Sequence, residues 1–536
     1  MELSRYLDRL ALARQGLAKA PTPEQLDKQT FVNDYDSIHS DSLLEGRAWL
    51  GGSSDEILRF YGNQERIDYN TEPWYYRNKR SYFWARSSLE REIKRTHSGF
   101  AKDIVDTDVT LMGWPLATVQ REGAEARLRS ILSERKVREL AEDRQEPLTL
   151  VDGWGCYKIW WEAGDPMPRV TYYDAMNVRF YGDLPCMDGV SFMDWYTDAS
   201  GKRYLSVETR MKSPDGKTWK AFYDVFRDIG SGNVMQVPNA NADALFGKKP
   251  EIVDLPLPFA VPCKYYDDPD GNLPGRSIYA GKFDVFDDID QAFSQMSNAV
   301  RRSTPVETFD LDYCERDRDG TPRMPRLFER MYVGVRGTRN AYGESNSATP
   351  VQVSQPRIDI SLYKLAIETL MKKAISGHLS PVTMAIDTER GDSADSKRES
   401  EKVTVFTRNR LCERQASMLS SLFNQLLVAD QYLRDGNVSC LDYGVTVQYT
   451  EFSNVSFESR ITTMTTILAN GAISPRMFVR KVYNGSLSKE EEEGEIKWIE
   501  DRNAKDVAPT VQPEPSSPSE EGDDYSLDGI LKEIDG

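Results

Sequence analysis

Residues 274–303 read PGRSIYAGKF DVFDDIDQAF SQMSNAVRRS, and this stretch decides how the rest of the chain is interpreted. Its apolar side chains recur at steps of three and four, which predicts an amphipathic helix from Ile278 to Ser303. At 1.5 Å per residue such a helix would be roughly 40 Å long. Thr304-Pro305 ends it. The apolar positions are Phe283, Phe286, Ile289, Phe293, Met296 and Val300.

Before this helix, from Leu148 to about Val261, apolar residues recur with a period of two. Turn sequences such as Asp198-Ala-Ser-Gly201 separate the runs, so this block is predicted to be an antiparallel, hairpin-rich sheet. Further toward the N-terminus, Ala101 to Trp114 also alternates. Helices are predicted at Glu2–Lys19, Asn78–Arg95 and Ala124–Leu140. The predicted strands are Leu148–Val151, Cys156–Trp161, Arg169–Tyr173, Ser191–Tyr196, Arg203–Thr209 and Thr218–Phe226.

After the long helix, the chain is polar and rich in arginine from Pro305 to Pro356. A second helix is predicted from Asp359 to Ile375 and, behind the polar loop Asp387–Asp395, a long one from Ser396 to Arg434. The fold class is therefore predicted as α+β. The remaining predicted elements are a strand at Tyr443–Phe452, a helix at Phe457–Leu468 and two short helices within Ser474–Arg502.

Composition narrows the possible functions. The 68 basic and 85 acidic residues give a net charge of −17, which disfavours a protein that holds nucleic acid by neutralising phosphates. There is no run of about 18 apolar residues and no secretion signal, so neither a membrane span nor secretion is expected. The six cysteines are far apart, and the three histidines lack metal-ligand spacing. No cofactor and no metal are predicted, and no Gly-x-x-x-x-Gly-Lys phosphate loop occurs.

The order of the predicted elements resembles that of the portal proteins of tailed double-stranded DNA bacteriophages, and several segments carry the resemblance. Pro274–Asp290 is similar to the family's first stem helix, where a turn precedes a helix that begins with aspartates. Gly391-Asp-Ser-Ala-Asp-Ser396 resembles the small-residue loop before the long helix. Two further stretches are similar to the family: Asp55–Asn70 with Phe83-Trp84 before Ile93–Ser98, and Gly471–Pro475 before an acidic helix at Glu490–Glu493. The resemblance spans about residues 40–502.

The resemblance implies a portal-type fold with a β-rich wing, two stem helices, a small clip and a helical crown. The implied parts are an N-terminal helix and arm (1–39), the wing (40–273), stem helix 1 (274–304), the clip (305–357), stem helix 2 (358–380), the tunnel-loop region (381–396), the long helix and return to the wing (397–470), the crown helices (471–506) and an acidic tail (507–536) expected to be disordered.

The implied function is a ring-shaped DNA channel at one capsid vertex, without catalysis. The resemblance implies a homo-oligomer, usually of twelve copies, whose partners are the terminase large subunit, the head–tail adaptor, the major capsid and scaffolding proteins, and double-stranded DNA passing through. Its location would be the virion, and the host cytoplasm during assembly. The alternatives are a metal-dependent hydrolase or nuclease with an Asp/Glu site, or a minor capsid or scaffold protein.

Three groups of site residues are predicted. Asp284, Asp287 and Asp288 would line the channel, although acids at a helix start also simply complement the helix dipole. Arg390, Asp392, Ser393 and Lys397 would belong to the tunnel loop. Seven clip arginines either form a docking surface, because guanidinium groups suit interfaces, or belong to a solvated face. They are Arg316, Arg318, Arg323, Arg326, Arg330, Arg336 and Arg339.

Overall fold

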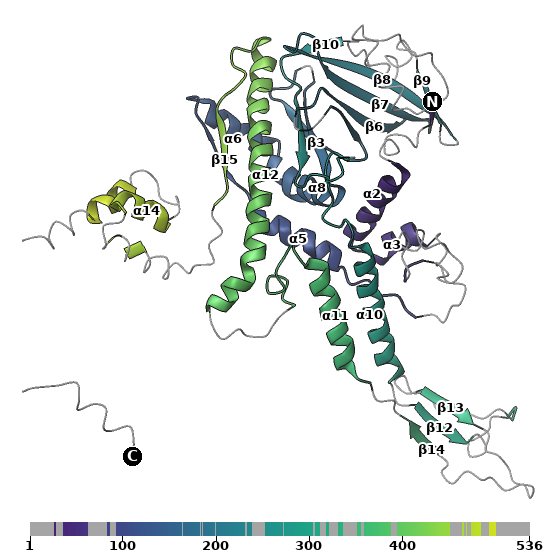
Figure 1. Ribbon diagram of the computed structural model, residues 1–536. Helices are drawn as coiled ribbons and strands as arrows, with labels where there is room; N and C mark the ends of the chain where they lie inside the picture. The colour runs from purple at the N-terminus through teal and green to yellow at the C-terminus, as the bar shows by residue number, and fades with distance from the viewer. Residues whose placement is uncertain are drawn as a thin grey trace, which may run out of the picture. The chain divides into compact units, whose positions relative to one another are not determined.

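The computed structural model divides the chain into two compact units, Met1–Tyr449 and Thr450–Gly536 (Figure 1). Helices and mainly antiparallel sheets make up the first unit, which confirms the α+β class. No helix among the described residues is both long and apolar enough to span a membrane. The structure describes residues 26–27, 36–62, 83–85, 93–162, 164–182, 184, 186–198, 200–230, 233–237, 252–271, 273–303, 306–310, 318–320, 331–335, 351–354, 358–386, 394–450, 464–465, 468, 473–483 and 492–499.

The predicted antiparallel block forms two sheets. The larger has the order β1-β9-β8-β7-β6-β5, with β10 also paired to β8, and the smaller has the order β11-β3-β4. Consecutive strands β5 to β9 are antiparallel neighbours, as expected for a hairpin-rich sheet. The strands are β1 (Leu26–Asp27), β3 (Trp154–Trp160), β4 (Arg169–Asp174), β5 (Val178–Tyr181), β6 (Gly189–Thr197), β7 (Arg203–Lys212), β8 (Trp219–Gly230), β9 (Asn233–Gln236), β10 (Ile252–Leu255) and β11 (Ala260–Lys264).

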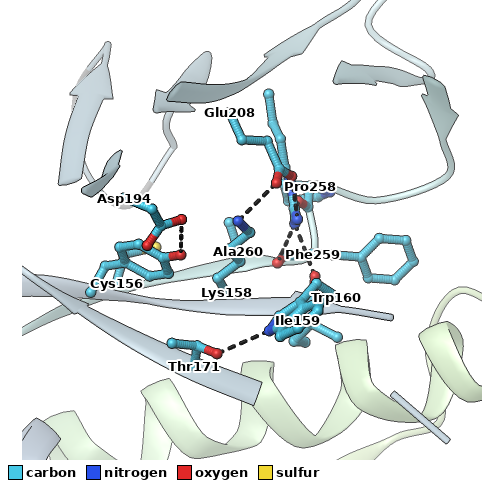
Figure 2. A network of polar contacts seen from close by, with 12 residues as sticks. Cys156, Lys158, Ile159, Trp160, Thr171, Asp194, Glu208, Pro258, Phe259 and Ala260 are labelled. Carbon is cyan, nitrogen blue, oxygen red and sulfur yellow. Dashed lines mark hydrogen bonds and ion pairs between the residues drawn. The ribbon is translucent and has the colours of Figure 1, made fainter. Parts of the chain in front are cut away.

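A buried ionic network joins the two sheets (Figure 2). Lys158 Nζ of β3 lies 2.8 Å from a carboxylate oxygen of Glu208 on β7, and Arg210 Nε donates to the other oxygen at 2.7 Å. The Arg210 guanidinium also donates to the carbonyl of Phe259 at 2.7 Å. Burial alone would raise the pKa of Glu208, but Arg210 and Lys158 lower it to about 2. The carboxylate is therefore ionised and fixes one sheet against the other.

Helices replace two predicted extended segments. Ala101–Trp114 is largely the helix α5 (Phe100–Met112), and Leu148–Val151 lies in α8 (Glu146–Asp152), so both strand-like interpretations were wrong. In α5 the buried side chains include Phe100, Ile104 and Val105, which recur at helical spacing. Leu148–Val151 is a short apolar run, and periodicity alone cannot distinguish a strand from a buried helix at that length.

The predicted helix over Ala124–Leu140 is confirmed but interrupted. It consists of α6 (Ala124–Glu134) and α7 (Val137–Leu140), separated at Lys136, whose positive φ of 49° ends the first helix. A π-helical turn, η3 (Ala141–Gln145), then leads into α8. In the predicted helix Asn78–Arg95, the described residues 83–85 and 93–95 are not helical, so the prediction is wrong there. The N-terminal elements described are α2 (Asp36–Leu50) and α3 (Ser54–Tyr61).

The stretch quoted first forms α10 (Phe283–Arg302), which begins five residues later than predicted. The returning helix α11 (Ile360–Ile375) agrees with the prediction, and Asp359 caps it by accepting from Ser361 N. Between the two helices the predicted turn-rich segment contains a three-stranded sheet of order β13-β12-β14, with β12 and β13 parallel. Its strands are β12 (Val306–Asp310), β13 (Met331–Val335) and β14 (Val351–Ser354).

The predicted long helix is α12 (Ala394–Asp435), about 63 Å long. Its C-terminal half is buried through residues such as Leu419, Phe423 and Leu426. The following strand β15 (Val445–Gln448) pairs with β2 (Leu116–Val119). This pairing joins two segments that are more than 300 residues apart in the sequence. In the second unit, α14 (Pro475–Tyr483) and a helical segment at 492–499 match the two predicted short helices.

Several predictions fall on undescribed residues. The helix Glu2–Lys19, most of Phe457–Leu468 and the acidic tail beyond residue 506 lie outside the described part of the chain. The division into wing, stem helices, clip, tunnel loop and crown stays a prediction.

Candidate functional site: the α10–α11 helix pair

The helices α10 and α11 lie side by side in antiparallel orientation (Figure 1). Lys282 Nζ, at the start of α10, donates to the carbonyl of Ala374 near the end of α11 at 2.5 Å. Burial lowers the pKa of Lys282, and the charge of Asp108 opposes that change. This contact shows how the two helices are aligned: the first turn of α10 lies beside the last turn of α11.

Asp290 anchors α10 to the chain segment around residues 84–98. Its fully buried carboxylate accepts from Trp84 Nε1 at 3.0 Å, from Ser98 N at 2.8 Å and from Ser98 Oγ at 2.7 Å. The same carboxylate lies 2.7 Å from His97 Nδ1. Sequence analysis missed this role. The available signal was that Asp290 follows directly on the apolar face marked by Phe286 and Ile289.

The three aspartates predicted to line a channel do not share one environment. Asp287 is only 4% exposed and accepts a hydrogen bond from Phe83 N at 2.8 Å. Its carboxylate faces the interior of the chain, so the channel-lining prediction is wrong for Asp287. A helical step of 100° per residue turns position 287 inward while positions 284 and 288 stay outside.

Asp284 and Asp288 are exposed and lie one turn apart on α10. Partial burial raises the pKa of both carboxyls, and for Asp284 the neighbouring charge of Asp288 adds to the increase. Within the described residues, neither carboxylate is assigned an ion pair.

The outer face of α11 carries large apolar side chains in water. On this face Leu362 is 64% exposed and Leu365 is 62% exposed; Ile360, at the first position of the helix, is 54% exposed. Elsewhere, Phe406 in the N-terminal half of α12 is 71% exposed. Adjacent exposed apolar side chains on helices are typical of a surface that another protein covers.

The structure describes few of the residues predicted for the clip docking surface and for the tunnel loop. Arg318 is described and exposed, whereas the other six clip arginines lie outside the described residues. Of the tunnel-loop residues, Lys397 lies in α12, and Arg390, Asp392 and Ser393 are outside the described residues. Both groups stay predictions.

The described residues contain no group of three or more His, Cys, Asp and Glu side chains arranged to hold a metal ion. The two histidines whose side chains are described each bond a buried aspartate, His97 to Asp290 and His378 to Asp108. These pairs hold helices and loops together inside the chain.

No protein-family model and no curated protein matches this sequence. Similar chains occur in solved structures of gene transfer agent (GTA) particles. One, from the neck of an empty particle computed with C6 symmetry, has 12% identity and a TM-score of 0.35 over 74% of this chain and 89% of that chain. Another, from the virion of a native particle, has 11% identity and a TM-score of 0.33 over 74% and 89%. A third, from the neck of a native particle computed with C12 symmetry, has 12% identity and a TM-score of 0.31 over 74% and 90%. At these values the likeness by itself establishes neither a family nor a function.

Proposed function

We propose that this chain is the subunit of a ring-shaped, non-enzymatic DNA channel, the portal of a phage-like particle. The observation that carries the proposal is the order and geometry of the elements from α10 to α12. A small three-stranded sheet lies between the two antiparallel helices in the sequence, and a 42-residue helix follows them. The sequence resemblance to portal proteins predicts this order of a stem helix, a clip, a returning stem helix and a long helix.

The exposed faces of these helices support assembly into a ring. In a single copy of the chain, the side chains of Leu362, Leu365 and Phe406 are more than half exposed. Exposed apolar side chains lower the solubility of a protein unless a partner covers them. In a ring, each copy presents two different surfaces to its two neighbours, and such heterologous contacts close when the rotation between copies divides a full turn. The neighbours would then cover the apolar side chains.

The remaining roles follow from the proposed identity. The clip with its seven arginines would dock the terminase large subunit during packaging and the head–tail adaptor afterwards. Arg390, Asp392, Ser393 and Lys397 would lie near the DNA, and Asp284 and Asp288 are the two predicted channel-lining residues that remain exposed. The major capsid and scaffolding proteins would surround the ring in the virion.

The test is the assembly state of the full-length chain. Mass photometry and negative-stain microscopy at several concentrations and salt levels should show closed annular particles with a central hole. A protein that stays monomeric or dimeric under all these conditions would contradict the proposal. Metal-dependent nuclease activity in such a monomer would favour the enzymatic alternative.

A further inference from the structure

An exposed strip runs along α11 on the side away from the protein interior. Leu362, Leu365, Ala366, Thr369 and Lys373 are all exposed and follow one another at steps of three, one, three and four. Residues at these spacings share one helix face. The buried side chains of α11, which are Ile367, Ala374 and Ile375, lie on the opposite face. The strip is apolar at its start and ends in a cation about 16 Å further along.

A second strip runs along the outer side of α10. Asp284 and Asp288 are exposed, and Ala292, Gln295 and Ala299 continue the same face at steps of four, three and four. This strip begins with two carboxylates and continues with small or uncharged side chains. No ion pair is assigned to Asp284, Asp288 or Lys373 among the described residues. The two strips therefore have opposite charge at one end and little charge at the other.

The complementary parts of the two strips also lie at the same positions along the helix axes. The contact between Lys282 and Ala374 places Lys373 level with the first turns of α10, where Asp284 and Asp288 lie. Leu362 is eleven residues before Lys373, so it is level with α10 residues about eleven positions beyond Asp284, near Gln295 and Ala299. Rotation about an axis roughly parallel to these helices preserves height, so the same levels meet when the strip on one copy faces the other strip on its neighbour.

We propose that the outer face of α11 docks against the outer face of α10 on the next copy of this chain. Lys373 then pairs with Asp284 and Asp288 of that copy, and Leu362 and Leu365 pack on its Ala292 and Ala299. This inference rests on the proposed ring and specifies one of its contacts. It gives the two exposed aspartates a protein partner in place of a position on the channel wall.

The physical basis is that each strip supplies what the other lacks. Two carboxylates one turn apart repel each other in the single copy, and a cation from the neighbour relieves that repulsion. Small side chains on α10 let the leucines of α11 approach closely. An exposed ion pair adds little affinity by itself, so the apolar part supplies most of the attraction and the charges set the register and the choice of face.

The experiment uses two full-length charge-reversal variants, D284K/D288K and K373E. In each variant alone, like charges meet at every contact, so we expect the population of rings in mass photometry to fall at least tenfold relative to wild type. Exposed positions in loops of the wing supply the matched controls D270K and K217E, which should assemble as the wild type does. Circular dichroism and melting temperature establish that all variants fold.

The decisive sample is an equimolar mixture of the two variants. Alternating copies bring the lysines at positions 284 and 288 against the glutamate at position 373, and the wild-type charges against each other at the next contact. We expect the mixture to recover rings, and the triple variant D284K/D288K/K373E to form rings alone.

The outcomes separate this inference from the proposed function. Rings that form normally in both variants, or a folded mixture that recovers none, would overturn the docking of α11 on α10 while leaving the ring itself intact. If the wild-type chain forms no ring, the proposed function fails first, and this contact fails with it.

Discussion

At the scale of single residues, the carboxyl of Glu146 in α8 is buried and only partly hydrogen-bonded. Its Oε1 accepts from Gln415 Nε2 at 3.2 Å, and its buried Oε2 has no hydrogen-bond partner in the described residues. Burial, with a further contribution from Glu142, raises the pKa of Glu146 to about 8. The other ionisable side chains around it are Cys412 and the phenols of Tyr157, Tyr265 and Tyr449. The carboxyl is therefore neutral in the folded chain at neutral pH.

This predicts a specific dependence of stability on pH. Between the unfolded pKa of 4.5 and the folded pKa of about 8, the folded state binds the extra proton, so stability falls as pH rises through that window. Substitution of Glu146 by Gln removes the titration. We expect the melting temperature of E146Q to depend less on pH between 5 and 8.5 than that of the wild type, with the largest advantage at pH 8.5.

The control for this measurement is E139Q, which removes an exposed carboxyl from the neighbouring helix α7. Its melting temperature should follow the wild-type curve. An E146Q curve parallel to that of the wild type would show that Glu146 does not titrate in this window.

At the scale of elements, α10 combines an anchored face and an open face. Asp290 holds the inner face through Trp84, His97 and Ser98, and Asp284 and Asp288 mark the outer face. Removal of the Asp290 carboxylate leaves several buried donors without an acceptor. Each such donor costs about 1–3 kcal/mol.

We therefore expect D290A to lower the free energy of unfolding by about 3 kcal/mol or more. Urea denaturation followed by tryptophan fluorescence measures this change. D143A, which removes an exposed carboxylate from the turn η3, is the matched control and should change stability by less than about 0.5 kcal/mol. Equal effects of the two substitutions would remove Asp290 from its anchoring role.

The elements that periodicity predicted well are long and lie partly in solvent. The helices α11 and α12 were predicted from helical spacing that continues over most of their 16 and 42 residues, and the strands β6 to β8 from apolar runs separated by turn sequences. Of the two segments that differ, 148–151 is a short and almost fully buried apolar run, whereas in 101–112 the exposed residues Asp103, Asp106 and Thr110 recur at the helical spacing that an alternating interpretation overlooks. Tertiary packing decides the conformation of the short run, because its periodicity fits a buried strand and a buried helix equally well.

At the scale of the whole molecule, the acidic C-terminal segment is predicted to contribute nothing to folding. Residues 507–536 contain eight acidic residues and one basic residue and few apolar ones, so the segment cannot offset its ordering entropy by burial. Deletion of Ala508–Gly536 should change the free energy of unfolding by less than about 0.5 kcal/mol and leave assembly unchanged. Denaturation and mass photometry of the truncated chain test this, and a large loss of stability would contradict it.

The sequence alone determined the α+β class and the order of a sheet block followed by the elements α10, α11 and α12. These properties depend on hydrophobic periodicity and on residue types within short stretches, and both can be observed in the sequence itself. Only the tertiary structure decided that Asp287 and Asp290 turn inward, that Glu208 joins two sheets between Lys158 and Arg210, and that Lys373 is level with Asp284. Each of these depends on which partner a distant segment brings to the residue, and spacing in the sequence does not carry that information.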